Sequence, residues 1–368
     1  MTLQDLCRDL IAIDAGADRV PQEIHAVVTD SRRACNGALF VCLKGERGDG
    51  RAFIGDAVRR GASAVLVSDI PSDVQEKQDT TVILRHADPS SVLPVLLNRV
   101  YGDPSRTMSL IGITGTNGKT TTAYLIEAVY KNAGKECGVI GTVNYRFAGH
   151  VFEAKNTTPG AADIFDYLAQ MVKAGAEACA IEVSSHALVQ GRVNGLLFRQ
   201  AVFSNLTSDH LDYHQTREEY FLAKSKLFDG TVPIETAVLN QDDPYGRRLQ
   251  QITSAPAVMY GIDGPADVRA EDVSLGLTGS TFKIRTPEWQ TAVETRLIGR
   301  HNVYNILAAV SVCRAQGFSV DEIQQGIQSL QGVPGRLERV DGAQDFFVFV
   351  DYAHTEDALN NVLESLRG

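Results

Sequence analysis

Leu110-Ile111-Gly112-Ile113-Thr114-Gly115-Thr116-Asn117-Gly118-Lys119-Thr120 is the stretch that decides the fold class of this 368-residue sequence. Its apolar start predicts a buried strand, and the residues from Thr121 to about Ala133 have helical spacing. A strand, a glycine-rich loop and a helix in this order form a phosphate cradle, because glycines let backbone N–H groups approach an anion at the helix N-terminus. We therefore expect Lys119 to reach the outer phosphates of a nucleotide and Thr120 to bind Mg²⁺.

The loop departs from the strict phosphate-loop pattern GxxxxGK[ST], because Ile113 stands where the first glycine belongs. A chance glycine-rich turn is the alternative. The strand before the loop and the helix after it, with Gly134 as the expected C-cap, favour a phosphate loop.

Outward from the loop, residues 105 to about 335 repeat a strand–loop–helix rhythm. This pattern predicts an α/β domain with a mostly parallel sheet covered on both faces. Alternation from Val268 to Leu297 predicts an antiparallel edge or hairpin, and Asn302 to Cys313 predicts a helix. The apolar runs of the parallel sheet are Leu110–Thr114, Gly138–Val143, Ala178–Val183, Ala201–Phe203 and Ala237–Leu239.

Residues 1 to about 104 have the pattern of a smaller α/β domain. Strands are expected at Ala38–Leu43 and Ala64–Val67, with a helix at Phe53–Arg60 between them. Tyr101-Gly102-Asp103-Pro104 is a turn and the expected linker to the next domain.

A third region begins after Gly335-Arg336, with a strand expected at Phe346–Val350 and a helix at Thr355–Leu366. One strand and one helix cannot bury a core of their own. Residues 336–368 are therefore interpreted as the start of an incomplete C-terminal domain.

The composition limits the function classes. Hydrophobic residues make up 44% and charged residues 22%, the mix of a soluble globular protein, and the formal net charge is −10. This charge argues against a general nucleic-acid binder but is compatible with a local phosphate site. Met1–Leu10 has no signal-peptide pattern, no apolar run is long enough to cross a membrane, and the six cysteines are scattered. We expect a cytoplasmic monomer with small-molecule substrates and no nucleic-acid or membrane partner.

The loop Thr114–Thr122 resembles the ATP loop of the Mur ligase family, although folylpolyglutamate and cyanophycin synthetases have similar loops. Further segments, in the expected order, are similar to signatures of that family and extend the resemblance over essentially the whole chain. These segments are Thr29-Asp30-Ser31-Arg32, Asn156-Thr157-Thr158-Pro159, Glu182–Leu188 with Gln190 and Arg192, Asn205–His214, Gly299-Arg300-His301-Asn302, Gly335-Arg336-Leu337-Glu338 and Asp351-Tyr352-Ala353-His354-Thr355. Those that begin at Asn156, Glu182 and Asn205 resemble MurE-type members, and the one that begins at Thr29 resembles both MurE-type and MurF-type members.

The resemblance implies a fold and an activity. The fold is a Mur ligase architecture: a small N-terminal α/β UDP-binding domain, a central P-loop-type ATPase domain and a truncated Rossmann-like C-terminal domain. The activity is ATP- and Mg²⁺-dependent addition of an amino acid, diaminopimelate or lysine, to UDP-MurNAc-L-Ala-D-Glu through an acyl phosphate in peptidoglycan synthesis.

Two departures bear on the activity. Glu356 stands where the family usually has proline, and the motif that selects the incoming amino acid is not among the 368 residues. We therefore expect the chain to be inactive or weakly active in ligation, and the sequence does not choose the amino acid. The alternatives are a MurF-like or cyanophycin-synthetase-like ligase and a non-catalytic nucleotide-binding fragment, which UDP-muramoyl-dipeptide binding and ATP turnover would separate.

The resemblance also implies residue roles. Lys119, Lys224, Glu182 and His210 are the implied catalytic residues, with Lys224 carbamylated, and Thr120, Glu182 and His210 are the implied Mg²⁺ ligands. The implied ATP contacts are Gly115, Thr116, Asn117, Gly118, Lys119, Thr120, Thr121, Asn302, Arg336 and Asp351. The implied contacts to the UDP-muramoyl-peptide are Thr29, Ser31, Glu46, Arg47, Gly48, Thr157, Thr158, Ser184, Gln190 and Arg192.

Without the resemblance, the same residue types favour ordinary roles. A strand-end glutamate is more often solvated than metal-bound, a lone histidine is usually structural, and a lysine on a helix normally faces solvent. Ser31 and Asn302 would be helix or turn caps. Lys226 is the alternative to Lys224 if the register of the resemblance is shifted.

Overall fold

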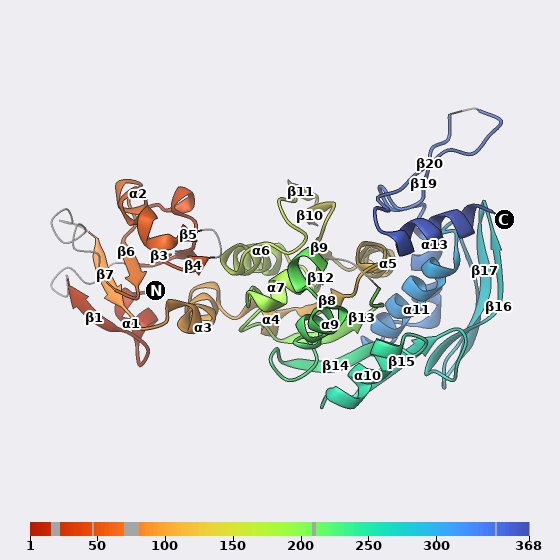
Figure 1. Ribbon diagram of the computed structural model, residues 1–368, viewed down its shortest axis with the longest axis horizontal. Coiled ribbons are helices and arrows are strands. Elements are labelled where there is room, and N and C mark those ends of the chain that lie inside the picture. The colour runs from red at the N-terminus through yellow and green to blue at the C-terminus, as the bar shows by residue number, and fades with distance from the viewer. Residues whose placement is uncertain (16–22, 46–47, 70–80, 208–210, 343, 368) are drawn as a thin grey trace. The chain divides into compact units, whose positions relative to one another are not determined.

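The computed structural model, drawn in Figure 1, describes residues 1–15, 23–45, 48–69, 81–207, 211–342 and 344–367. The chain forms two compact units, each with its own sheet. Unit 1 consists of residues 1–107, 160–170 and 194–196, and unit 2 of residues 108–159, 171–193 and 197–368. Within the described ranges, no helix is long and apolar enough to cross a membrane.

Unit 1 is built on a five-stranded sheet in the order β1-β7-β6-β3-β2. Strand β1 is antiparallel to β7, and the other neighbours are parallel. All side chains of β3 and β6 are buried, as expected for inner strands of a parallel sheet covered on both faces. The strands are Ala12–Ala15 (β1), Ala26–Val28 (β2), Ala38–Val41 (β3), Ala64–Val67 (β6) and Val82–Arg85 (β7), with a separate ladder of Lys44–Gly45 (β4) and Gly48–Asp49 (β5).

Helix α3 (Pro89–Tyr101) is a unit 1 element that the sequence patterns above do not predict. The side chain of its N-cap, Asp88, accepts from the N–H of Ser90, and left-handed Gly102 ends the helix. The other helical segments are α1 (Leu3–Cys7), η2 (Ser31–Arg33), η3 (Gly50–Phe53), α2 (Ile54–Arg59) and α4 (Pro104–Thr107), while α6 (Ala161–Lys173) contributes residues to both units.

Unit 2 is built on an eleven-stranded mixed sheet in the order β11-β10-β9-β12-β8-β13-β14-β15-β16-β17-β18. The strands from β9 to β16 in that order are parallel, and antiparallel strands extend the sheet at both sides. The strands are Ser109–Thr114 (β8), Cys137–Ile140 (β9), Asn144–Phe147 (β10), His150–Glu153 (β11), Ala178–Glu182 (β12), Phe198–Phe203 (β13), Ile234–Asn240 (β14), Ala257–Gly261 (β15), Val268–Gly276 (β16), Gly279–Arg285 (β17) and Gln290–Thr295 (β18).

Helices connect the strands of unit 2, and a short two-stranded ladder follows the main sheet. The helices are Lys119–Asn132 (α5), Ser185–Val189 (α7), Leu211–His214 (α8), Arg217–Ser225 (α9), Pro244–Ile252 (α10), Arg300–Ala315 (α11), Val320–Ser329 (α12) and Glu356–Leu366 (α13), and the ladder is Glu338–Arg339 (β19) with Phe349–Val350 (β20).

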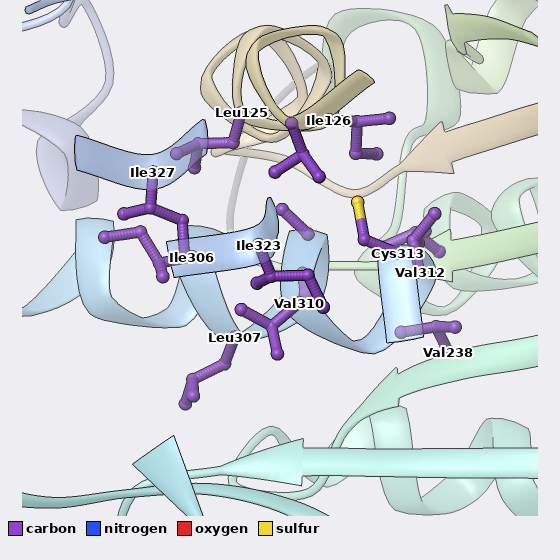
Figure 2. Close-up of a cluster of buried hydrophobic side chains, with 14 of the residues drawn as sticks. Leu125, Ile126, Val238, Ile306, Leu307, Val310, Val312, Cys313, Ile323 and Ile327 are labelled. Carbon is purple, nitrogen blue, oxygen red and sulfur yellow. The ribbon is translucent and has the colours of Figure 1, made fainter. Parts of the chain in front are cut away.

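The main core of unit 2 lies where α5, α11 and α12 pack together (Figure 2). Ile126 of α5, Val310 of α11 and Ile323 of α12 are at most 1% exposed. Gly326 permits the close approach of α12 to α5, because a Cβ at this position would overlap the backbone of Val129. This packing fixes α5, the helix that begins at the glycine-rich loop.

Most predicted elements differ from the structure at their ends, and two of these differences have a local cause. Helix α5 begins at Lys119 rather than Thr121, because left-handed Gly118, with φ of 89°, is its N-cap. Strand β20 covers only the last two residues of the predicted Phe346–Val350, since its partner β19 offers two residues for pairing. Phe346 is 64% exposed.

Candidate active site

A cavity of about 700 Å³ opens in unit 2 at the carboxyl ends of its parallel strands. This edge is where open α/β sheets bind ligands, and the volume is in the range of small-molecule sites. The predicted residues that line it are Thr116, Asn117, Gly118, Lys119, Thr120, Thr121, Thr157, Glu182, Asn302, Arg336 and Asp351.

The glycines of the loop between β8 and α5 are required by the neighbouring segments. Gly115 has φ of 144° and Gly118 has φ of 89°, backbone conformations that other residues rarely adopt. A Cβ at Gly115 would overlap Ser204 Oγ, and a Cβ at Gly118 would overlap Asn305 Oδ1. The loop is therefore a cradle with no room for side chains at these two positions.

Asn205 holds the loop from the end of the neighbouring strand β13. Its main-chain carbonyl accepts from the N–H of Thr116 and its Oδ1 accepts from the N–H of Asn117, both at 2.9 Å. Asn117 O in turn accepts from Ser204 Oγ at 2.6 Å. The first N–H groups of α5 follow directly on this loop, and the N-terminus of a helix is a backbone segment that favours an anion.

Two lysine side chains donate hydrogen bonds to main-chain carbonyl oxygens of the loop. Lys119 Nζ donates to the carbonyl oxygens of Gly115 at 2.9 Å and Thr116 at 2.8 Å. Lys224 is 2% exposed, and its Nζ donates to the same Gly115 oxygen at 2.9 Å. The ring of Tyr220 lies 4.4 Å from Lys224 Nζ. Lys226, the alternative by register, is the half-buried C-cap of α9.

Glu182, at the end of β12, is a buried carboxylate with three donors. It is 1% exposed, and it accepts from Thr142 N at 3.0 Å, Thr142 Oγ1 at 3.0 Å and Thr120 Oγ1 at 3.2 Å. Arg336 Nη2 donates to Thr120 Oγ1 at 3.1 Å. The structure therefore brings together two predicted metal ligands, Thr120 and Glu182, with a predicted ATP contact, Arg336.

The third predicted metal ligand, His210, lies outside the described residues. Over the part of the chain that is described, no group of three or more His, Cys, Asp or Glu side chains could hold a metal ion. The oxygen donors of Thr120 and Glu182 nevertheless suit Mg²⁺, which prefers few protein oxygens and keeps several waters.

The predicted peptide contacts of unit 2 gather beside Glu182. Thr158 Oγ1 donates to Glu182 O at 2.7 Å and accepts from Ser184 N at 3.0 Å. Arg192 Nη1 donates to Thr158 O at 2.6 Å, and Arg192 Nε and Nη2 donate to Gln190 Oε1 at 2.9 and 2.6 Å. Four residues predicted from two motifs thus form one hydrogen-bonded cluster.

Other residues that line the cavity belong to α11 and to the segment between α12 and α13. Asn302 Nδ2 donates to Ile298 O at 2.8 Å, a bond that ties the first turn of α11 to the residue before its N-cap, Gly299. Both oxygens of Asp351 accept from backbone N–H groups, those of Leu337 at 2.7 Å and Ala353 at 2.6 Å. Asp351 therefore orders its own segment, a role that its predicted contact with ATP did not include.

Asp242 is a cavity residue that the sequence analysis missed. It follows β14 and accepts from the N–H groups of Ile262, Asp263 and Gly264 and from the hydroxyl of Tyr304 at 2.9 Å. Burial alone would raise the pKa of Asp242, but these hydrogen bonds lower it below its ordinary value. The available signal was a polar run, Asn240 to Asp243, directly after an apolar strand.

The predicted uridine-end residues that the structure describes, Thr29, Ser31 and Gly48, lie in unit 1. Ser31 Oγ donates to Asp56 Oδ2 at 2.8 Å, and this bond, with that from Arg60, lowers the pKa of Asp56. Glu46 and Arg47 lie outside the described residues.

Comparison with known proteins identifies relatives of both units. Residues 113–313 match the family model of the Mur ligase middle domain, and residues 23–101 match that of the Mur ligase family, catalytic domain. A UDP-N-acetylmuramoyl-L-alanyl-D-glutamate–2,6-diaminopimelate ligase of Geobacillus kaustophilus is 46% identical over 352 residues, which cover 94% of this chain and 71% of that protein.

Two further comparisons agree. The ligase of the same name from Bacillus licheniformis is 42% identical and covers 100% of this chain, which spans 75% of that protein. A solved structure described as a UDP-N-acetylmuramoyl-L-alanyl-D-glutamate–2,6-diaminopimelate ligase superposes with a TM-score of 0.82 at 30% identity, covering 100% of this chain and 74% of that one. The similarity thus extends over both units.

Proposed function

This chain belongs to the Mur ligase family, and from that membership we propose that it is an ATP-dependent ligase of peptidoglycan synthesis, which adds an amino acid to UDP-N-acetylmuramoyl-L-alanyl-D-glutamate. The observation that carries the proposal is the cavity of unit 2, where Lys119, Thr120 and Glu182 meet at the carboxyl ends of parallel strands. The relatives are named for 2,6-diaminopimelate, which favours this amino acid over lysine.

The proposed reaction has two steps. The terminal carboxylate of the substrate attacks the γ-phosphorus of ATP and ADP leaves, after which the amine of the amino acid attacks the acyl carbon and phosphate leaves. In such phosphoryl transfer the protein contributes mainly positioning and charge stabilisation. We assign charge stabilisation at the phosphates to Lys119, to the N-terminus of α5 and to Arg336. The guanidinium of Arg336 donates a hydrogen bond to Thr120, which directly follows Lys119.

Thr120 and Glu182 are the residues that would hold Mg²⁺, with His210 as the further ligand that the resemblance implies. Their side-chain oxygens lie 3.2 Å apart, and hard oxygen ligands suit this ion. When bound, Mg²⁺ neutralises charge on the phosphates.

Lys224 is proposed to carry a carbamate, formed when its neutral amine adds to CO₂ and releases a proton. Its burial and its position beside Lys119 support the proposal, because both ammonium groups donate to one carbonyl oxygen. An anion at Lys224 would turn repulsion between the two side chains into attraction.

The substrate contacts are proposed for both units. The cluster of Thr158, Ser184, Gln190 and Arg192, with Thr157 in the cavity, is assigned to the muramoyl-peptide. The uridine end is assigned to unit 1, at Thr29, Ser31 and the segment Glu46–Gly48. Since the substrates are small nucleotide-linked molecules, we propose a cytoplasmic enzyme that acts as a monomer.

Product analysis tests the proposed function. The chain is mixed with ATP, Mg²⁺, UDP-MurNAc-L-Ala-D-Glu and either diaminopimelate or lysine, and mass spectrometry follows the UDP-muramoyl-tripeptide while an enzymatic assay follows phosphate. Slow formation of tripeptide that requires both diaminopimelate and ATP is expected. ATP hydrolysis that ignores the UDP-muramoyl substrate would argue for a different nucleotide-dependent activity.

A further inference from the structure

Thr142 contacts both oxygens of the Glu182 carboxylate. Its backbone N–H donates to Oε1 and its hydroxyl donates to Oε2, each at 3.0 Å. The preceding residue, Gly141, allows this approach, because a Cβ there would overlap Oε1. Thr142 follows β9, the strand next to β12, so the clamp joins two neighbouring strand ends.

The hydroxyl of Thr142 also lies 3.1 Å from the hydroxyl of Thr157. A threonine hydroxyl has one proton to donate and two lone pairs, whereas an ionised carboxylate only accepts. Since Thr142 donates its single proton to Glu182, it can only accept from Thr157. The proton of Thr157 is therefore committed to Thr142.

The same assignment of donors and acceptors applies on the other side of the carboxylate. Thr120 Oγ1 donates to Glu182 Oε2 and accepts from Arg336 Nη2. The hydrogen bonds therefore run inward from both sides, from Thr157 through Thr142 and from Arg336 through Thr120, and they end at Glu182. A directed network of this kind is satisfied in one proton arrangement only.

We propose that Thr142 is a positioning residue that fixes the carboxylate of Glu182 and the hydrogen-bond direction of Thr157. Thr157 lines the cavity, and with its proton committed it offers a ligand only lone pairs. The group of the muramoyl-peptide that meets Thr157 is then a donor, an amide N–H or a hydroxyl, and not a carboxylate. This inference rests on the proposed function, because it takes Glu182 as a metal ligand and Thr157 as a substrate contact.

The test compares Thr142→Val, which keeps the side-chain volume and the backbone N–H bond, with Thr142→Ser, which keeps the hydroxyl. Calorimetry measures the affinity for UDP-MurNAc-L-Ala-D-Glu. A second titration series measures the Mg²⁺ concentration at which ADP binding reaches half of its maximum. Thr142→Val is expected to weaken substrate binding about tenfold, the effect of one hydrogen bond to a charged network, and to raise the Mg²⁺ requirement. Thr142→Ser is expected to keep the wild-type substrate affinity and Mg²⁺ requirement. If Thr142 only filled space, the serine variant would not behave like wild type.

A double-mutant cycle with Thr157→Val identifies the hydroxyl chain. If Thr142 acts on the substrate through Thr157, the double variant binds substrate no more weakly than Thr157→Val alone, whereas independent contacts give additive losses. Thr81→Val is the matched control, because its buried hydroxyl donates only to Ala62 O in unit 1. If Thr142→Val does not fold, the substrate affinity of Thr157→Val and a neutron structure of the deuterated wild type still test the inference.

The neutron structure is expected to place the deuterium of Thr157 toward Thr142 Oγ1. A deuterium on Thr157 that points into the cavity, unchanged binding in Thr142→Val, or additive losses in the cycle would each overturn the inference while leaving the proposed function intact. A wild-type protein that binds neither ADP nor UDP-MurNAc-L-Ala-D-Glu would overturn the proposed function and this inference with it.

Discussion

Lys119 and Lys224 donate to one and the same acceptor, the main-chain carbonyl oxygen of Gly115, at 2.9 Å each. The first lysine begins α5 and the second belongs to α9, so a helix far away in sequence takes part in fixing the loop conformation. Two side chains of like charge converge directly beside the segment proposed to hold phosphate. The charge on each of them should therefore affect nucleotide binding.

Lys119→Ala is expected to lower turnover by roughly 10²–10³, the effect of deleting one electrostatic stabiliser of a transition state. The variant also loses the two bonds from Nζ to Gly115 and Thr116, so ADP affinity should fall too. Phosphate release and ADP calorimetry measure the two effects. Lys173→Ala, on an exposed position of α6, is the control, and wild-type turnover in Lys119→Ala would refute the assignment.

Lys224→Ala is expected to be nearly inactive and to recover part of its activity when short carboxylic acids are added, because they replace the anion of the carbamate. With ¹³C-labelled bicarbonate, the wild type should show a carbamate signal by NMR that Lys224→Ala lacks. Lys226→Ala should keep both the signal and the activity. A wild type without the signal, or a fully active Lys224→Ala, would rule out the carbamate.

Gly141→Ala is expected to disturb the metal site without replacing either of the proposed ligands, Thr120 and Glu182. The new Cβ would overlap Glu182 Oε1, and overpacking of this kind costs about 1–3 kcal/mol. The thermal unfolding temperature should therefore fall, and Mg²⁺-dependent ADP binding should weaken. Adding Glu182→Ala to Gly141→Ala should restore stability but not binding.

Gly332→Ala serves as its control, since a Cβ there meets no atom within 4 Å. Equal unfolding temperatures and ADP affinities for Gly141→Ala and Gly332→Ala would show that Glu182 is not held where the structure places it.

Asp242→Asn tests the lowered pKa of Asp242. A carboxyl whose pKa is lower in the folded state stabilises the fold above its unfolded pKa of about 4, and this contribution is lost as pH falls through the folded value. The variant should therefore lose roughly 1–2 kcal/mol at pH 7, as expected for hydrogen bonds to a charged acceptor.

Urea unfolding at several pH values measures the difference between Asp242→Asn and wild type, with exposed Asp229→Asn as the control. The difference should shrink below about pH 4. A destabilisation of Asp242→Asn that is constant from pH 7 to pH 3 would mean that the charge of Asp242 is not what its four donors stabilise.

Much of the fold follows from local pattern. The strands β8, β12 and β14 each contain an apolar run, and the glycine-rich loop lies between a strand and a helix, so these local patterns predict them. The exact start of α5 depends instead on the left-handed conformation of Gly118. The length of β20 depends on how many residues of β19 can pair with it, and the sequence of β20 itself does not contain this information.

The site was predictable only where a motif carries a role. Lys119, Thr120 and Glu182 lie in such motifs, and the structure brings them to one cavity. Thr142 and Asp242 lie in no motif that the sequence analysis used. Their importance arises from neighbours far away in sequence, such as Glu182 for Thr142, and side-chain hydrogen bonds across strand ends leave no periodic signal.

The central claim is most directly tested by calorimetric titration of the 368-residue chain with UDP-MurNAc-L-Ala-D-Glu in the presence of Mg²⁺ and a non-hydrolysable ATP analogue. Binding at least tenfold tighter than that of UDP-MurNAc-L-Ala, which lacks the reacting D-glutamate, is the predicted result. Loss of this preference in Arg192→Ala is predicted as well. Equal affinity for the two compounds, or binding of neither, would contradict the account.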